Sequence, residues 1–168
     1  MDAIQFHSPN FSKRKHGVIN CIVIHDTGGH NAQGAVVWFS KKESQVSAHY
    51  VIDRDGTLYE CVEEEDKAWH AGVSSLHGVD NVNEFSIGIE LVDNNDKDKY
   101  PDEQISTLLK LTTDLCVKYS IPLNRIVGHC HVAPGRKVDP GPDFPWFEFL
   151  ASVGSNLIEK AVNGGDGD

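Results

Sequence analysis

The sequence predicts a single α/β domain in which helices flank a central mixed β-sheet. Apolar, β-branched runs typical of buried strands occur at residues 18–25, 85–92 and 125–128. Stretches with helical spacing of apolar residues lie between and after these runs, as in folds that alternate strands with helices. A hairpin signal within residues 47–62 interrupts the alternation, so we expect antiparallel as well as parallel pairing in the sheet.

Length, composition and charge fit this fold and argue against several classes of protein. The 168 residues suffice for one core, and we expect an N-terminal arm over residues 1–17, a folded domain over 18–162 and a flexible tail over 163–168. The formal net charge of −10 argues against nucleic acid as a partner, because phosphate backbones bind clustered Lys and Arg. No apolar run approaches the roughly 20 residues of a membrane span, and no signal-peptide pattern is visible. We expect a soluble monomer that is cytoplasmic at synthesis.

The cysteines are scattered along the chain without paired spacing, which is not the pattern of a disulfide framework or a zinc knuckle. They are Cys21, Cys61, Cys116 and Cys130. Cys21 and Cys116 lie in apolar runs, so we expect them to be small core residues.

The first predicted strand, residues 18–25, is almost continuously apolar, as in a central strand that is buried on both faces. Asp26 and a Thr-Gly-Gly turn end it, which places His25 at the carboxyl edge of the sheet, where α/β proteins collect their sites. Apolar spacing then predicts a short helix over about residues 33–42.

Two further strands, residues 47–53 and 57–62, flank an Asp-Gly turn at Asp55 and Gly56, which predicts a hairpin. We expect the acidic run that follows, residues 63–66, to be a solvated loop.

The strand at residues 85–92 has an informative alternation. Its apolar face carries two isoleucines and a leucine, and its other face carries Ser86, Gly88 and Glu90. A small, polar face that ends in a carboxylate suits the wall of a cleft.

The C-terminal third contains two predicted helices and a strand. Pro101 opens the first helix at a favoured early position, and helical spacing continues to about Ser120. The strand at residues 125–128 then leads into a loop rich in Gly and Pro. The last helix is expected over about residues 145–162.

Three residues form a candidate metal centre: His25, His129 and Asp139. Each histidine ends an apolar strand, and Asp139 lies ten residues beyond His129 in the proline-stiffened loop. Two imidazoles and one carboxylate are a catalytic zinc set, with a fourth position open for water. Alternatives stay open, because His131 shares the parity of His129 in an extended segment, Cys130 points the other way, and the segment can be an ordinary surface loop.

Hydrolysis at such a centre needs a base for a water proton and a positive group for the oxyanion that develops. Glu90 suits the first role because it lies on the polar face of its strand. Lys137 suits the second because it precedes Asp139 by two residues, on the same side of an extended loop. Without a metal nearby, both would be ordinary surface residues.

Other histidines and aromatic residues have less specific signals. We expect His49 to be a hydrogen-bonded structural histidine in its strand. Trp69 and His70 lie in a loop where an aromatic side chain beside a polar one suits a sugar or a peptide, and packed loop residues are the equal alternative. Together with Arg136, which adjoins Lys137, they are the candidate substrate-binding residues.

Five motifs, in one order along about residues 8–150, resemble those of the AmpD-type (type 2) N-acetylmuramoyl-L-alanine amidases. This family shares a fold with phage amidase lysozymes and peptidoglycan-recognition proteins. The motifs are Ile-Val-Ile-His-Asp-Thr at 22–27, Val-Ser-Ala-His-Tyr-Val-Ile at 46–52, Ala-Trp-His-Ala-Gly at 68–72, Phe-Ser-Ile-Gly-Ile-Glu-Leu at 85–91, and Val-Gly-His with Ala-Pro-Gly-Arg-Lys and Asp-Pro-Gly-Pro at 127–142.

The resemblance implies a mixed sheet flanked by helices, with one Zn²⁺ in a surface groove. It implies that His25, His129 and Asp139 are the zinc ligands, that Glu90 is the catalytic carboxylate and that Lys137 is the catalytic lysine. The implied reaction is hydrolysis of the amide between the lactyl group of N-acetylmuramic acid and L-alanine of the stem peptide.

Two departures separate this chain from the phage amidase lysozymes. Those enzymes carry a catalytic tyrosine at the position that is Ala48 here, so Tyr50 is not expected to inherit that role. Their third ligand is a cysteine, whereas it is Asp139 here, so Cys130 is not expected to bind metal.

The loop after Ala-Trp-His-Ala-Gly bears on the substrate. Recycling enzymes that act on anhydromuropeptides carry a basic residue there, whereas residues 73–84 contain no Lys or Arg. The resemblance therefore implies intact peptidoglycan as the partner. It also suggests a phage or prophage endolysin, an antimicrobial enzyme that reaches the wall by holin-type release or another export route. The alternatives are a cytoplasmic anhydromuropeptide recycling amidase and a non-catalytic recognition module that binds muropeptides.

Overall fold

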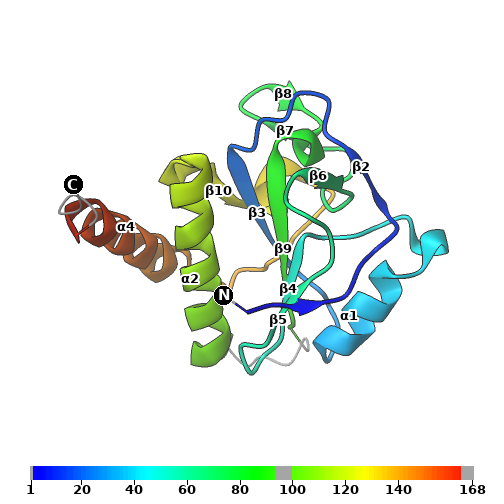
Figure 1. Cartoon of the computed structure of the whole chain (residues 1–168), viewed down its shortest axis with the longest axis horizontal. Helices are drawn as coiled ribbons and strands as arrows, with labels where there is room; N and C mark the ends of the chain where they lie inside the picture. The colour runs from blue at the N-terminus through cyan, green and yellow to red at the C-terminus, as the bar shows by residue number, and fades with distance from the viewer. Residues whose placement is uncertain (1, 94–99, 164–168) are drawn as a thin grey trace.

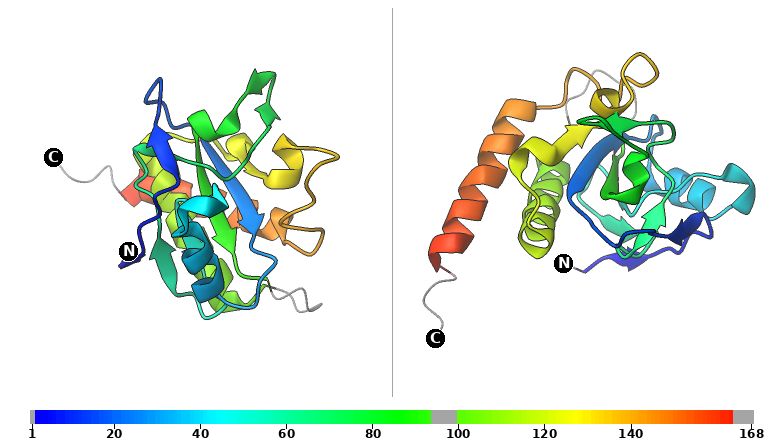
Figure 2. Two further views of the ribbon diagram at one scale, coloured as in Figure 1. Left: turned by 90° about the vertical axis from the view of Figure 1, so that its right-hand side faces the viewer. Right: turned by 90° about the horizontal axis from the view of Figure 1, so that it is seen from above.

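A computed structural model of the chain describes residues 2–93 and 100–163 (Figure 1). Helix α1 (Ala32–Phe39) packs on one side of a six-stranded sheet, and helices α2 (Asp102–Tyr119) and α4 (Trp146–Asn163) lie on the other side, as Figure 2 shows. This arrangement confirms the predicted α/β domain with a central sheet between helices. Asn163 ends α4, and the remainder of the predicted tail lies outside the described residues.

The central sheet is mixed, as the hairpin signal predicted. Its strands, in spatial order, are β1 (Ile4–Gln5), β5 (Leu58–Glu60), β4 (Tyr50–Ile52), β9 (Ser86–Leu91), β3 (Cys21–Asp26) and β10 (Ile126–Gly128). Strands β4, β9, β3 and β10 are parallel to one another, β5 is antiparallel to β4, and β1 is parallel to β5.

Short elements complete the chain. Two small antiparallel sheets pair β2 (Phe11–Lys13) with β6 (Asp66–Ala68) and β7 (Ser75–Leu76) with β8 (Val79–Asp80). The short helices are η1 (Lys42–Ser44), η2 (Val82–Glu84), η3 (Leu123–Arg125) and α3 (His129–Val132). Strands β1 and β2 thus place the first residues of the chain against β5 and β6.

The predicted hairpin turn joins β4 to β5. Gly56 has a φ of +83°, and a Cβ added there would lie 2.9 Å from the carbonyl oxygen of Glu103 in α2. The turn therefore requires glycine for its backbone conformation and for its close approach to α2.

The alternation of β9 separates a core face from a site face. Ile87, Ile89 and Leu91 are fully buried against α2 and α4 in the main hydrophobic cluster. Ser86, Gly88 and Glu90 therefore point to the other side of the sheet, together with His25, which pairs with Glu90 in the register of β3 and β9.

The acidic run at residues 63–66 was predicted to be a solvated loop, which is right for the exposed Glu63 and Glu65 and wrong for Glu64 and Asp66. Asp66 is buried in β6. Glu64 accepts hydrogen bonds from the hydroxyls of Tyr50 and Tyr119 and from Lys118 Nζ. The run folds against β4 and α2, where hydroxyl and ammonium donors pair with its charges, and sequence spacing does not reveal those donors.

The four cysteines are free thiols, and Cys21 and Cys116 are buried in the core as predicted. Across residues 2–93 and 100–163, no helix combines the length and the apolar character that a membrane span requires.

Candidate metal centre

The parallel strands β3, β9 and β10 bring their carboxyl ends to one edge of the sheet. Gly128 pairs with Ile24 in the register of β10 and β3, so the next residue, His129, lies beside His25. Glu90 lies beside His25 on the neighbouring strand. The sequence prediction that strand ends collect the site residues is therefore correct for these three side chains.

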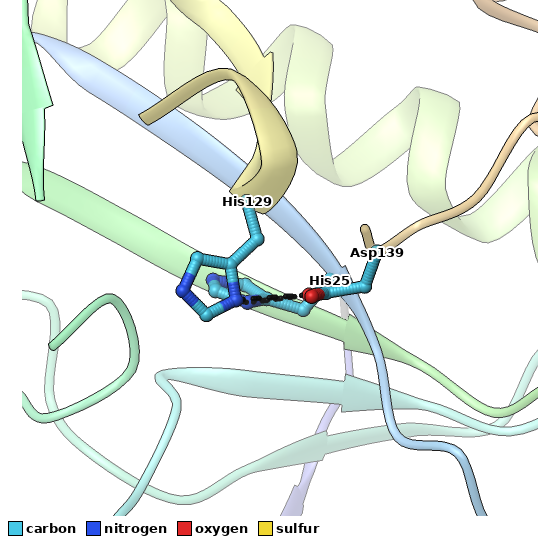
Figure 3. Close-up of side chains that lie close together, drawn as sticks. All are labelled: His25, His129 and Asp139. Carbon is cyan, nitrogen blue, oxygen red and sulfur yellow. Dashed lines mark hydrogen bonds and ion pairs between the residues drawn. The ribbon is translucent and has the colours of Figure 1, made fainter. Parts of the chain in front are cut away.

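The loop after α3 delivers Asp139 to the two histidines (Figure 3). His25 Nδ1 lies 2.9 Å from His129 Nδ1 and 3.2 Å from Asp139 Oδ2, and His129 Nδ1 lies 3.0 Å from the same oxygen. The backbone N–H of Cys130 donates to the carbonyl of Asp139 at 3.0 Å, which ties the loop to α3. Among the described residues, these three side chains lie close enough together to hold a metal ion.

The donor atoms suit a metal ion such as zinc. Three ligands of a tetrahedral ion, bound at about 2.0–2.1 Å, lie about 3.3 Å from one another, close to the separations in this cluster. His129 Nε2 lies 3.1 Å from the carbonyl of Ala71, which can only accept, so this nitrogen carries the proton and Nδ1 presents a lone pair. Burial lowers the pKa of His25 to about 4, which keeps its imidazole neutral and able to bind a cation.

Residues 129–131 were expected to be an extended segment of the loop, and residues 129–132 form helix α3 instead. His131 therefore does not share the direction of His129. Its Nδ1 accepts a hydrogen bond from the N–H of Gly128, and its ring packs against Trp146 with centroids 5.2 Å apart. The structure thus removes His131 from the ligand alternatives.

Glu90 has an electrostatic environment unlike that of an ordinary surface carboxylate. Its Oε2 is buried and has no hydrogen-bond partner among the described residues. Burial raises the pKa of Glu90 well above its ordinary value, and the charges of Asp139 and Asp26 raise it further. Lys137, which is exposed, opposes this shift in part.

The cluster opens into a cleft of about 800 Å³. All the site residues predicted from the sequence line it: His25, Trp69, His70, Glu90, His129, Arg136, Lys137 and Asp139. These residues therefore share one cleft, and their catalytic and substrate-binding roles stay predictions. Aromatic and apolar side chains, including Trp38 and Val46, line the same cleft.

Arg136 connects the cleft to the loop after the Ala-Trp-His-Ala-Gly motif. Its Nη2 donates hydrogen bonds to the carbonyls of Ala71 at 2.5 Å and Val73 at 2.7 Å. A basic group therefore lies at this loop although residues 73–84 contain none. The sequence could not show this contact, because it joins segments that are about 65 residues apart.

Two polar residues lie behind the cleft: the sequence predicted the structural role of His49 and missed that of Asn83. His49 is a hydrogen-bonded structural histidine, as predicted: its Nδ1 accepts from the N–H of Gly88 at 2.9 Å, and its Nε2 lies 3.1 Å from the carbonyl of Asp66. Asn83 carried no sequence signal, yet its Oδ1 accepts from the backbone N–H groups of His70 and Ala71.

Tyr50 lies away from the metal centre. Its hydroxyl donates to Glu64 at 2.6 Å, and its ring belongs to the core cluster that packs against α2. Ala48, at the position where phage amidase lysozymes carry a tyrosine, is fully buried. This placement agrees with the expectation that Tyr50 takes no catalytic role.

Comparison with known proteins gives a consistent match. A family model described as N-acetylmuramoyl-L-alanine amidase matches residues 15–142. The chain is 38% identical over 171 residues to the 1,6-anhydro-N-acetylmuramyl-L-alanine amidase AmpD of Haemophilus influenzae, an alignment that covers 90% of this chain and 92% of that protein. It is 47% identical over 109 residues to AmpD of Citrobacter freundii, where the match covers 65% of this chain and spans 58% of the relative.

Solved structures agree with the sequence comparison. The crystal structure of a selenomethionine AmpD derivative superposes with a TM-score of 0.75 at 35% identity, covering 89% of this chain and 93% of that one. AmiD of E. coli, solved with the substrate anhydro-N-acetylmuramic acid-L-Ala-D-gamma-Glu-L-Lys, gives 0.74 at 29% identity, covering 86% of this chain and 66% of that one. An endolysin amidase of Clostridium intestinale gives 0.72 at 24% identity, covering 91% and 95%, a likeness of fold alone.

Proposed function

The chain belongs to the N-acetylmuramoyl-L-alanine amidase family, and from this premise we propose that it is a zinc enzyme that hydrolyses the amide between N-acetylmuramic acid and L-alanine. The observation that carries the proposal is the convergence of His25, His129 and Asp139 within 3.2 Å of one another, in a cleft that also contains Glu90. A recognition module without turnover would need neither a complete ligand set nor an unpaired carboxylate beside it.

We propose that His25 Nδ1, His129 Nδ1 and Asp139 hold one Zn²⁺. Zinc at such a site supplies Lewis-acid chemistry, which lowers the pKa of water and polarises a carbonyl. Three protein ligands leave a position open, as catalytic zinc sites do. The cleft in front of the cluster gives substrate access to that position.

Glu90 is the proposed general base and acid. Its buried Oε2 has no hydrogen-bond partner among the described residues, so it is free to take a proton from the attacking water. Its raised pKa moves the carboxylate toward the pH range in which a base is most effective. In the second half of the reaction, Glu90 returns the proton to the amine nitrogen of the departing L-alanine.

Lys137 is the proposed stabiliser of the oxyanion that develops on the lactyl carbonyl. It lines the same cleft as Glu90 and lies two residues before Asp139 in the chain. An ammonium group placed where negative charge develops lowers the barrier more than it strengthens ground-state binding.

The substrate that we propose is a soluble anhydromuropeptide, in place of the intact peptidoglycan and endolysin that the sequence favoured. The relatives that are 38–47% identical to this chain are named 1,6-anhydro-N-acetylmuramyl-L-alanine amidases, whereas the endolysin match shows the fold alone. The endolysin and antimicrobial expectations have no comparable support. The recycling alternative is therefore the better-supported one.

The expectation of intact peptidoglycan rested on the missing basic residue in the loop at 73–84. Arg136 supplies a guanidinium at that loop from another segment, through its bonds to Ala71 and Val73. The absence of Lys and Arg in the loop sequence consequently no longer argues against an anhydromuropeptide. Contacts of substrate with Trp69, His70 and Arg136 remain predictions.

The test compares two substrates with the full chain loaded with zinc. A 1,6-anhydro-N-acetylmuramoyl peptide and purified peptidoglycan are digested in parallel, and mass spectrometry detects stem peptides with a free N-terminal L-alanine. We expect the higher kcat/KM on the soluble substrate, loss of both activities on chelation, and recovery with zinc.

Each contrary outcome has a distinct meaning. Faster release of stem peptides from intact peptidoglycan would favour the hypothesis of a wall-degrading enzyme. Binding of either substrate without new amine termini would support the recognition module. The Glu90→Gln variant is the control for contaminating amidases, because it should keep zinc and lose turnover.

A further inference from the structure

The two histidine ligands are supported differently behind their metal-facing nitrogens. His129 Nε2 faces the carbonyl of Ala71, which can only accept a hydrogen bond, so the tautomer of His129 is fixed by the backbone. His25 Nε2 lies 3.0 Å from Nδ1 of His70, and in a pair of imidazoles either nitrogen can be the donor. The tautomer of His25 therefore depends on what holds His70.

A hydroxyl and a carbonyl lie on the far side of His70. His70 Nε2 is 3.1 Å from Ser86 Oγ, and Ser86 Oγ is 2.7 Å from the carbonyl oxygen of Val82. Because that carbonyl only accepts, the single hydroxyl proton of Ser86 is donated to it. The Ser86 oxygen must then accept from His70 Nε2–H, and His70 Nδ1 is left to accept from His25 Nε2–H.

We propose that His70 and Ser86 are positioning residues that fix the tautomer of His25 and aim its Nδ1 lone pair at the metal. The inference rests on the metal centre of the proposed function. The Val82 carbonyl gives the chain of hydrogen bonds its direction, and Ser86 transmits that direction to His70. Metal-ligating histidines commonly have such a partner, but here the partner is a second imidazole whose own orientation has to be set.

The reverse direction would be unfavourable at both ends of the chain. The oxygens of Ser86 and Val82 would face each other at 2.7 Å without a proton between them. His25 would carry its proton on Nδ1, which lies 2.9 Å from His129 Nδ1, where the metal needs a lone pair. The observed 2.7 Å contact thus selects the tautomer that binds metal.

Burial and packing protect this chain of bonds from water. Ser86 is fully buried and His70 is 9% exposed. A Cβ added at Gly88 would lie 2.4 Å from Cγ of His70, so the imidazole occupies the space above a glycine. The prediction that the polar face of β9 forms a cleft wall is therefore right for Glu90 and wrong for Ser86 and Gly88, which lie beneath His70.

The test measures zinc affinity and imidazole tautomers rather than activity alone. The variants are Ser86→Ala, His70→Leu and His70→Asn, in which the Asn oxygen can replace Nδ1 as acceptor. Ser8→Ala is the matched control, because Ser8 is also buried and hydroxyl-bonded, accepting from the N–H of Asn10 and donating to the carbonyl of Phe39. Zinc dissociation constants come from competition with a chelator, and long-range ¹H–¹⁵N spectra report which ring nitrogen carries each proton.

We expect Ser86→Ala and His70→Leu to weaken zinc binding by about 10-fold or more, with Ser8→Ala unchanged and His70→Asn close to wild type. In the wild type, the spectra should place the protons of His25 and His70 on Nε2. A His70 proton on Nδ1, or wild-type zinc affinity in both Ser86→Ala and His70→Leu, would overturn the proposal.

The readouts also separate this inference from the proposed function. If the chain binds zinc with the expected tautomers yet cleaves neither muropeptide substrate, the amidase proposal fails and the positioning role stands. If the amidase is active and the tautomer of His70 does not respond to Ser86→Ala, the positioning role fails alone.

Discussion

Glu90 and Glu64 lie on opposite sides of the sheet, and the structure treats their carboxylates in opposite ways. Glu64 accepts from Tyr50 and Tyr119 hydroxyls at 2.6 and 2.5 Å and from Lys118 Nζ at 2.7 Å. Glu90 has a buried oxygen with no hydrogen-bond partner among the described residues. Buried polar atoms are normally paired, so Glu64 follows the common pattern and Glu90 departs from it beside the metal cluster.

The pKa directions follow the same division. Burial alone would raise the pKa of Glu64, but hydrogen bonds from Lys118, Tyr119 and Tyr50 outweigh it and the pKa falls below its ordinary value. Burial and neighbouring carboxylates raise the pKa of Glu90. The comparison teaches that a carboxylate whose oxygens are all hydrogen-bonded contributes to stability. A carboxylate with an unpaired oxygen beside a metal cluster remains available to take a proton.

Metal removal should produce the largest difference between the two regions. We expect chelation to abolish turnover and to lower the thermal midpoint, since a ligand at about 1,000 times its Kd stabilises the folded state by about 4 kcal/mol. Hydrogen exchange should show faster exchange around residues 129–139 and unchanged protection near Tyr119 in α2. Equal loss of protection in both regions would contradict the local role of the metal.

Substituting the unpaired carboxylate should have the next largest effect. Glu90→Gln is expected to lower kcat/KM by about 10²–10⁴-fold, the usual contribution of general acid–base catalysis. Zinc content should be unchanged, because Glu90 is not in the ligand cluster. Steady-state kinetics and metal analysis check this, and near-normal turnover would remove Glu90 from the mechanism.

The matched substitution on the other side should affect stability and leave catalysis intact. Glu64→Gln removes the charge that holds two hydroxyls and one ammonium, and we expect a loss of about 1–2 kcal/mol in the free energy of unfolding. The loss stays small because Lys118 is largely exposed. Urea unfolding measures it, and kcat/KM should match the wild type. A large loss of turnover in Glu64→Gln would contradict the assignment of Glu64 to stability and Glu90 to catalysis.

The smallest expected effect concerns pH, and its sign differs between the two residues. The lowered pKa of Glu64 contributes stability above its unfolded value of about 4.3, and this contribution is lost as the pH falls through the folded value. The raised pKa of Glu90 acts in reverse, because its contribution is present below about 4.3 and is lost as the pH rises.

Urea unfolding of the metal-free protein between pH 3 and pH 7 tests these signs. Relative to wild type, Glu64→Gln should lose stability as the pH rises through this range, and Glu90→Gln should gain it. Two variants with the same trend would show that the two carboxylates do not differ in the way the geometry indicates.

Periodicity in the sequence predicted most of the fold and the edge where the site lies. The predicted helix at 101–120 matches α2, and the predicted strand at 85–92 matches β9. His25, Glu90 and His129 converge because parallel strands end at one edge, a rule that needs no tertiary information. The residue pattern alone left Asp139 open, since a loop residue is placed by contacts such as the one between Cys130 and Asp139.

Sequence reasoning failed where the decisive contact joins distant segments. Glu64 in the acidic run is paired by donors from α2, and the loop at 73–84 receives its basic group from Arg136. The prediction that His129 and His131 point the same way was also wrong, because residues 129–132 form one turn of helix rather than an extended chain. Through-space pairing and a local change of backbone conformation leave no periodic signal.

Two consecutive residues, His70 and Ala71, lie behind both histidine ligands, and Asn83 holds their backbone N–H groups. The loop between Ala71 and Asn83, residues 73–81, carries the exposed Val73 and Val79, and none of its residues lines the cleft of the metal centre. Because Asn83 and Arg136 hold the start of this loop from outside it, we expect the loop to tolerate changes of length and composition without moving the metal ligands. For protein engineering, exchanging this loop between relatives should therefore leave zinc affinity unchanged as long as Ala71, Asn83 and Arg136 are kept.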